Sequence, residues 1–182
     1  MLYICGSFDR GGFGPPSFSA QMNSPQLTEL ISSFVNNRLS GESHFLVGVR
    51  VSSDLRCVTI LLDGDSGVDV DFCARMSREI GEQLEGLEEV PAYVLEVSSP
   101  GADTPMKLLR QFPKHIGRTL LVRLKGGVGE VKGELKKVND ENLYIRESVA
   151  GKKNNKTRSP FGEEVKVIPF IQIEYARVII QM

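Results

Sequence analysis

One stretch of the sequence decides the fold: Tyr93-Val94-Leu95-Glu96-Val97-Ser98-Ser99-Pro100-Gly101. Its first residues are mostly aromatic, aliphatic or β-branched, which predicts a strand, and the Pro-Gly pair predicts a turn directly after it. The pattern of helices and strands changes across this turn, and so does the charge. We therefore place a domain boundary here, and we expect Ser98, Ser99, Pro100 and Gly101 to have a structural role at the junction.

Upstream of the turn, the spacing of apolar residues predicts two helices and two further strands. The first helix begins at Ser24-Pro25, an N-cap followed by proline, and ends near Gly41. Strands are expected over residues 45–51 and 56–62. The second helix follows Asp69, which can cap it. The order is αββαβ, and we expect both helices to cover one face of a three-stranded sheet.

Downstream of the turn, the sequence predicts a short connecting helix that starts at Thr104-Pro105, and after it only short strands. Five such strands, separated by turn residues, predict a small barrel, because closure removes exposed sheet edges. Gly133 lies within one of these strands, where a barrel corner needs a sharp bend. The expected strands cover residues 119–124, 130–138, 142–146, 165–170 and 176–180.

The expected fold class is therefore α+β, in two domains. Residues 1–21 are rich in Gly, Pro and Ser, which favours a disordered extension, with Met22 as an alternative start of the protein. We expect an N-terminal α/β domain over residues 22–101, a connector over residues 102–118 and the small barrel over residues 119–182. No apolar run reaches the ~18 residues that a membrane-spanning helix needs, so we expect a cytoplasmic protein that acts away from membranes, as a monomer.

Charge divides the chain in the same place. The net charge is -1, which argues against a uniformly basic RNA-binding protein. Residues 22–101 contain 5 Lys or Arg and 13 Asp or Glu, a net charge of -8, whereas residues 102–182 contain 16 and 9, a net charge of +7. Such asymmetry indicates two surfaces for two different partners.

The basic half supplies the candidate residues for contact with RNA phosphates. They are Lys107, Arg110, Lys114, Arg118, Arg123, Lys125, Lys132, Lys136, Lys137, Lys152, Lys153, Lys156 and Arg158. The acidic half supplies a candidate face for a basic protein. It consists of Asp63, Asp65, Asp69 and Asp71.

The sequence gives little indication of a metal site, of a disulfide or of catalysis. A calcium-binding loop that began at Asp63 would need glycine at its sixth position and glutamate at its twelfth, where this chain has Val68 and Ala74. Cys57 and Cys73 have no CxxC spacing and are expected to be buried small hydrophobes. Neither of the two histidines accompanies Ser98 or Ser99 in a catalytic arrangement. We therefore predict no catalytic residue, no metal site and no cofactor.

Three motifs resemble one known family in the family's own order. The stretch 93–101 is similar to the signature of the RimP family at its domain junction. Phe112 followed by Ile116-Gly117-Arg118 resembles the family's entry into its second domain. Gly67-Val68-Asp69-Val70-Asp71-Phe72-Cys73, with Ser77-Arg78, resembles the start of its second helix. One departure follows the junction: Ala102-Asp103-Thr104-Pro105-Met106 stands where the family usually has Leu-Asp-Arg-Pro-Leu, so no role of that arginine transfers to Thr104.

The resemblance implies an N-terminal domain with a KH-like outline and an SH3-like or Sm-like C-terminal barrel. It also implies a non-enzymatic ribosome maturation factor that acts on the immature 30S subunit. Small-subunit ribosomal protein twelve and 16S rRNA are the partners expected on this basis. The alternative is an Sm/KH-type RNA-binding regulator that acts on mRNA. The acidic N-terminal half favours the first interpretation, because a carrier of a basic protein benefits from negative charge and an mRNA binder does not.

Overall fold

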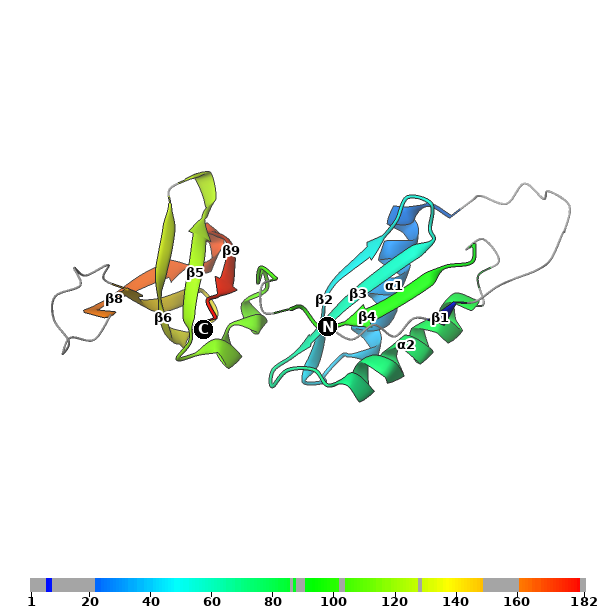
Figure 1. The fold of residues 1–182 in the computed structure, drawn as a ribbon, viewed down its shortest axis with the longest axis horizontal. Helices are drawn as coiled ribbons and strands as arrows, with labels where there is room; N and C mark the ends of the chain where they lie inside the picture. The colour runs from blue at the N-terminus through cyan, green and yellow to red at the C-terminus, as the bar shows by residue number, and fades with distance from the viewer. Residues whose placement is uncertain are drawn as a thin grey trace, which may run out of the picture. The chain divides into compact units, whose positions relative to one another are not determined.

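A computed structural model describes residues 6–7, 22–85, 87, 91–101, 104–127, 129–148 and 161–180. It divides into two compact units, Met1–Pro100 and Gly101–Met182. The first combines helices with a sheet and the second is an antiparallel sheet with short turns (Figure 1). The predicted α+β class is confirmed. Of the expected N-terminal extension, only the two residues of strand β1 belong to the described part of the chain.

The first unit has the predicted αββαβ order, preceded by one short strand. Its elements are β1 (Gly6–Ser7), α1 (Ser24–Arg38), β2 (His44–Val51), β3 (Cys57–Gly64), α2 (Val70–Glu85) and β4 (Val94–Ser98). The sheet order is β1-β4-β3-β2. Strands β2 and β3 form an antiparallel hairpin, whereas β3 and β4 are parallel, because α2 crosses between them.

Both helices pack on the same face of this sheet, as predicted. Val58 lies beside Leu95 and Ile60 beside Val97 in the β3–β4 register, so these four side chains share one face. They are all buried, in a single core with Ile31 of α1 and with residues of α2. Burial of each such aliphatic side chain contributes about 1.5–3 kcal/mol. The opposite face of the sheet is more open, and Cys57, which we expected to be buried, is exposed on it.

The start of α1 differs by one residue from the prediction. The N-cap is Asn23, whose side chain accepts a hydrogen bond of 3.0 Å from the backbone N–H of Gln26. Gln26 accepts one of 3.0 Å from the backbone N–H of Asn23 in return, which completes a capping box. The predicted cap, Ser24, instead donates its hydroxyl to the Val51 carbonyl at 2.8 Å. Ser24 therefore joins the helix to the end of β2.

The second unit is a five-stranded antiparallel sheet with the order β8-β7-β6-β5-β9, and its fold is barrel-like. The strands are β5 (Thr119–Leu124), β6 (Glu130–Val138), β7 (Asn142–Ser148), β8 (Phe161–Pro169) and β9 (Ile173–Val178). Short 3-10 turns accompany them: η1 (Leu109–Gln111), η2 (Pro113–His115), η3 (Lys125–Gly127) and η4 (Phe170–Gln172). The fifth strand begins earlier than predicted, since the chain turns at η4.

The predicted connecting helix is wrong. Residues after Thr104 form an isolated bridge between Met106 and Ala176 of β9, followed by the turns η1 and η2. Gln111, which is 2% exposed, accepts hydrogen bonds of 3.1 Å from the backbone N–H groups of Lys107 and Leu108. A buried glutamine thus stabilises a non-helical conformation of this segment. The Thr-Pro pair occurs both at helix starts and in such segments, so the pair alone could not predict which one forms.

Candidate nucleic-acid interface

The sheet of the second unit has an apolar inner face and a polar outer face. Leu120 and Val122 of β5, Val131 and Leu135 of β6, and Ile145 of β7 are buried in one core. Successive residues of a strand point to opposite faces, so the residues between them lie on the outer face. That outer face is where most of the predicted cations of β5 and β6 are found.

A row of three residues crosses the middle of this outer face. Lys132 of β6 and Arg177 of β9 both lie opposite Leu121 of β5 in the register. Both cations are exposed. Neither forms an ion pair with any residue that the structure describes. Two cations held on either side of an aliphatic side chain form a surface that can contact successive phosphates.

Two other predicted cations on this face are already neutralised. The Arg123 guanidinium lies 3.2 Å from Glu130 and 3.7 Å from Glu174. A hydrogen bond with Tyr175, together with the charges of those two glutamates, raises the pKa of Arg123. The Lys136 ammonium lies 2.6 Å from the Glu134 carboxylate. A phosphate would have to compete with these carboxylates.

The remaining predicted cations are distributed over the second unit. Lys137, the last residue but one of β6, lies on the outer face, with its ammonium 5.7 Å from the centre of the Tyr144 ring. Arg110 and Lys114 lie on η1 and η2, and Arg118 directly precedes β5. The structure therefore places the set on more than one face, and only part of it forms a continuous surface. Lys152, Lys153, Lys156 and Arg158 lie outside the described residues.

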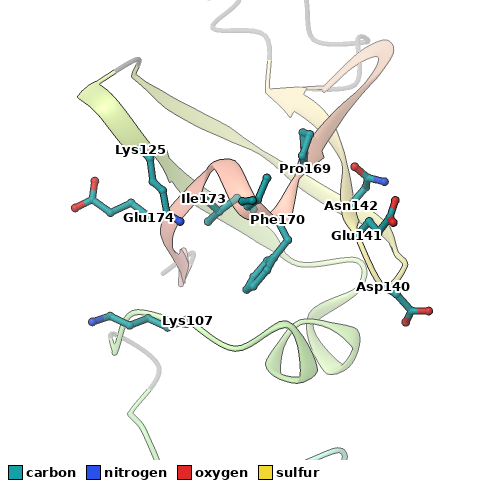
Figure 2. Close-up of a pocket in the computed structure, with 10 residues that line it drawn as sticks. Lys107, Lys125, Asp140, Glu141, Asn142, Pro169, Phe170, Ile173 and Glu174 are labelled. Atoms are coloured by element: carbon teal, nitrogen blue, oxygen red, sulfur yellow. The ribbon is translucent and has the colours of Figure 1, made fainter.

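Lys107 and Lys125 line a groove of about 820 Å³ (Figure 2). Phe170 lies at its centre, with Lys125 and Glu174 at one side and Asp140 and Glu141 at the other. Asn142, Pro169, Ile171 and Ile173 complete the lining. The mixture of both charges around an apolar floor does not favour phosphate, so these two lysines are poorer candidates for RNA contact than Lys132.

Sequence reasoning missed two residues of the outer face, Arg146 and Arg177. Arg146 lies on β7 opposite Glu134, and it forms no ion pair within the described part of the chain. Each arginine follows a buried inner residue, Ile145 or Ala176. The alternation of apolar and charged residues along these strands was the signal that could have assigned them to the same face as Lys132.

The predicted acidic face is smaller than the sequence suggested. Asp63, at 5% exposure, accepts a hydrogen bond of 2.8 Å from the backbone N–H of Gly64, so little of its carboxylate is available to a partner. Asp65, Asp69 and Asp71 are exposed between the end of β3 and the first turn of α2. Asp69 caps α2 as predicted, because it accepts a hydrogen bond of 2.7 Å from the backbone N–H of Phe72.

The junction residues Ser98, Ser99, Pro100 and Gly101 lie at the end of β4 and in the segment that follows it. Ser98 ends β4 opposite Leu61 of β3, and Ser99 and Pro100 follow. The Gly101 carbonyl accepts a hydrogen bond of 2.8 Å from the backbone N–H of Thr104. In the described ranges, no three His, Cys, Asp or Glu side chains are grouped so that they could hold a metal ion. None of the described helices is both long enough and apolar enough to cross a membrane.

The fold and this surface define a class: a two-unit α+β protein whose second unit presents a cationic sheet face. Residues 36–103 match the family model described as the RimP N-terminal domain. The chain is 36% identical over 120 residues to the ribosome maturation factor RimP of Cytophaga hutchinsonii, which covers 63% of this chain and 71% of that relative. The chain belongs to the RimP family of ribosome maturation factors.

Two further relatives have the same name. The protein from Flavobacterium psychrophilum is 38% identical over 101 residues, with 56% of this chain and 62% of the relative covered. The protein from Chlorobium chlorochromatii is 32% identical over 131 residues, with 60% of this chain and 73% of the relative covered. The predicted family is confirmed.

Proposed function

We propose that this protein is a cytoplasmic, non-enzymatic factor that assists assembly of the small ribosomal subunit by binding the immature 30S particle. The observation that carries the proposal is the row of Lys132, Leu121 and Arg177 on the outer face of the second sheet. Membership of the RimP family indicates that the target is the ribosome, and this row is a surface that could bind rRNA.

The proposal predicts a salt dependence that two substitutions reduce. Lys132→Gln and Arg177→Gln together remove two candidate phosphate contacts. Each lost contact lowers the slope of log affinity against log salt by about 0.7–0.9. Lys166→Gln is the matched control, because the Lys166 ammonium lies 3.3 Å from Glu147 and is already paired. Binding of purified immature 30S particles is measured from low to high salt.

An unchanged slope in the double variant would show that this face does not touch rRNA. Association of the wild-type protein with mRNA fragments, and not with 30S precursors, would instead favour the mRNA regulator. The protein is expected to act as a monomer, which sedimentation of the free protein checks.

A second surface is proposed to attract a basic ribosomal protein, with small-subunit protein twelve as the partner that the family resemblance implies. It consists of the exposed Asp65, Asp69 and Asp71, on a half of the chain whose net charge is -8. Complementary charge raises the association rate more than it changes the dissociation rate. Replacing the three with Asn keeps a capping residue at position 69, so α2 should remain intact.

Surface plasmon resonance with the purified ribosomal protein tests this surface. We expect a lower association rate for the triple variant at low salt and a smaller difference at high salt. Asp54→Asn is the matched control, since it removes an exposed charge of the same unit elsewhere. An association rate equal to that of wild type at low salt would leave the groove or an edge strand of the second unit as the docking site.

A further inference from the structure

A second row on the outer face of the C-terminal sheet combines an aromatic ring with apolar and cationic neighbours. Tyr144 of β7 lies between Lys137 of β6 and Val167 of β8 in the register. The next row places Arg146 beside Val165. Paired residues of antiparallel strands share a face, so these five side chains form one surface, which we call the Tyr144 platform.

The ring of Tyr144 has one face at the molecular surface. Lys137, an exposed residue, holds its ammonium over this ring face, 5.7 Å from the ring centroid, so the face lies on the solvent side of the sheet and the lysine must swing aside when a base stacks there. The side-chain amide of Asn139 donates a hydrogen bond of 3.3 Å to the Tyr144 hydroxyl. The Asn139 hydrogen bond limits the motion of the ring, which lowers the entropy lost when a flat ligand stacks on it.

The two valines extend the platform with apolar surface. Val165 is 45% and Val167 50% exposed, and both lie on β8, the strand beside β7 at one end of the sheet order. Their positions beside the ring extend the apolar area, with Lys137 and Arg146 as neighbours in the same two rows. Glu134 faces Arg146 across the strands, but its carboxylate already lies 2.6 Å from the Lys136 ammonium. The balance of charge around the platform is therefore positive.

An unpaired nucleotide matches this combination better than other ligands do. Its base stacks on an aromatic ring, and its flanking phosphates require cations. A duplex presents phosphates but keeps its bases stacked inside, so it would leave the ring and the valines unused. An acidic peptide would contact the cations and leave the ring without a stacking partner.

We propose that the Tyr144 platform is a stacking site for an unpaired base of single-stranded RNA, with Lys137 and Arg146 contacting the adjacent phosphates. This inference rests on the proposed function, because it names the kind of rRNA segment that the second unit holds. It also adds a contact that depends on the base rather than on charge alone. A precursor rRNA segment that has not yet paired offers such bases.

Stacking and charge have different salt signatures, and this difference tests the proposal. The probe is a fluorescein-labelled oligouridylate, and its anisotropy is measured with the full-length protein. Tyr144→Leu should weaken binding by about 5- to 150-fold, as the loss of one stacked base does, with the salt slope unchanged. Lys137→Gln should lower the slope by about 0.7. Tyr144→Phe keeps the ring and loses only the hydrogen bond to Asn139, so its affinity should lie far closer to wild type than that of Tyr144→Leu. Lys166→Gln should bind like wild type, since the Lys166 ammonium is paired with Glu147.

Photo-crosslinking of the wild-type protein gives a second reading that requires no folded variant. An oligonucleotide that contains 5-iodouridine should crosslink to Tyr144, and peptide mass spectrometry locates the site. Crosslinks confined to other residues, or equal affinity of Tyr144→Leu and wild type, would overturn the proposal. If Tyr144→Leu loses the oligonucleotide but still binds 30S precursors with the wild-type salt slope, the Tyr144 platform is real and the proposed function stands on the Lys132 row. If neither the wild-type protein nor Tyr144→Leu binds 30S precursors, the proposed function fails whatever the result with the oligonucleotide.

Discussion

At the scale of single residues, Gly133 has a different role from the one that its position in the sequence suggested. We expected it to bend a strand. A Cβ atom at this position would instead collide with the carbonyl oxygen of Arg146 and the side chain of Ile145 on the neighbouring strand. The glycine therefore permits β6 and β7 to approach closely beside the core residue Ile145.

The first prediction follows from this close approach. Gly133→Ala should destabilise the second unit by about 1–3 kcal/mol, because a methyl group must displace backbone rather than a flexible side chain. Urea denaturation, followed by a probe in the second unit, measures the change. Gly48→Ala, in strand β2 of the first unit, is a useful comparison, since a Cβ atom there meets nothing within 4 Å and the residue does not have a positive φ. Equal stability of Gly133→Ala and wild type would contradict the packing described above.

Two cysteines give a prediction about pH. Burial, and the negative charge of Asp69, raise the pKa of the Cys73 thiol, whereas Cys57 is exposed. The thiolate is the reactive form, so Cys73 should react appreciably only at a pH above the ordinary thiol range. Mass spectrometry after iodoacetamide treatment at neutral pH should therefore find Cys57 alkylated before Cys73. Faster modification of Cys73 would mean that the core around α2 opens readily.

At the scale of elements, the sequence predicted both long helices and every strand of the two sheets except β1, because the apolar residues of those elements recur with clear periods. Strand β1 (Gly6–Ser7) lies in the Gly-, Pro- and Ser-rich stretch for which no strand was expected. The sequence placed the start of α1 one residue late, since Asn and Ser are both good N-caps and only the structure reveals which side chain faces the helix. It also predicted a connecting helix that does not form. Buried hydrogen bonds to the Gln111 side chain stabilise the non-helical conformation of that segment, and the spacing of apolar residues in the sequence does not reveal such bonds.

The same limit applies to the candidate site. Counting cations along the sequence found Lys132 and Lys137, but it could not separate them from Lys136, which is paired with Glu134. That distinction depends on cross-strand register. Arg177 was missed for the same reason. It is 45 residues from Lys132 in the sequence, and the two lie in one row only because both strands pair with β5.

The N-cap of α1 gives the prediction at this scale. Asn23→Ala should destabilise the helix by about 1 kcal/mol, and Asn23→Asp by much less, because aspartate also accepts the Gln26 N–H. Hydrogen exchange of the first-turn amides of α1 should accelerate in the alanine variant. Unchanged exchange in the alanine variant would show that Ser24, through its bond to Val51, fixes the helix start without the cap.

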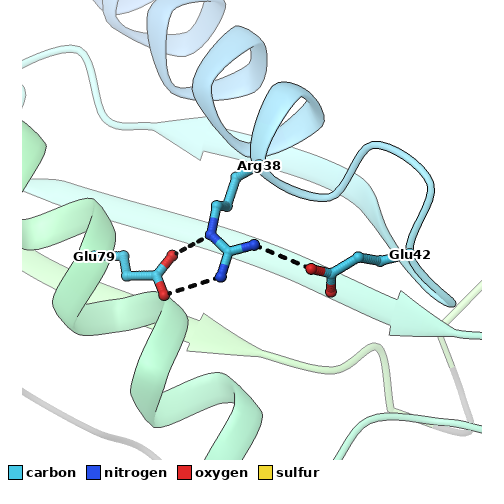
Figure 3. A network of polar contacts seen from close by, with 3 residues as sticks. All are labelled: Arg38, Glu42 and Glu79. Atoms are coloured by element: carbon cyan, nitrogen blue, oxygen red, sulfur yellow. Dashed lines mark hydrogen bonds and ion pairs between the residues drawn. The ribbon is translucent and has the colours of Figure 1, made fainter.

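The other end of α1 is tied to α2 by a polar network. The Arg38 guanidinium contacts Glu79 at 2.8 Å and Glu42 at 3.0 Å (Figure 3). Hydrogen bonds with Glu79, and then with Glu42, raise the pKa of Arg38. The side chain is 40% exposed, so salt screens these pairs and they contribute little to stability. The network orients the helix ends, and the apolar core holds the helices on the sheet.

At the scale of the whole molecule, opposite charges lie on different units. The acidic half contains the exposed aspartates at the start of α2, and the basic half contains the outer face with Lys132 and Arg177. Charge of one sign on each unit is the arrangement that the proposed function requires, because it would steer a basic protein and an RNA to separate surfaces.

Binding of immature 30S particles through Lys132 and Arg177 is tested by sucrose-gradient sedimentation of cell extracts that contain either the wild-type protein or the Lys132→Gln/Arg177→Gln variant. We expect the wild-type protein to migrate with free, immature 30S particles at low salt, and the double variant to shift to the top of the gradient at a lower salt concentration than the wild type. Lys166→Gln should follow the wild type. Wild-type protein found in mRNA fractions and absent from 30S particles, or a double variant that stays with 30S particles as firmly as wild type, would contradict this expectation.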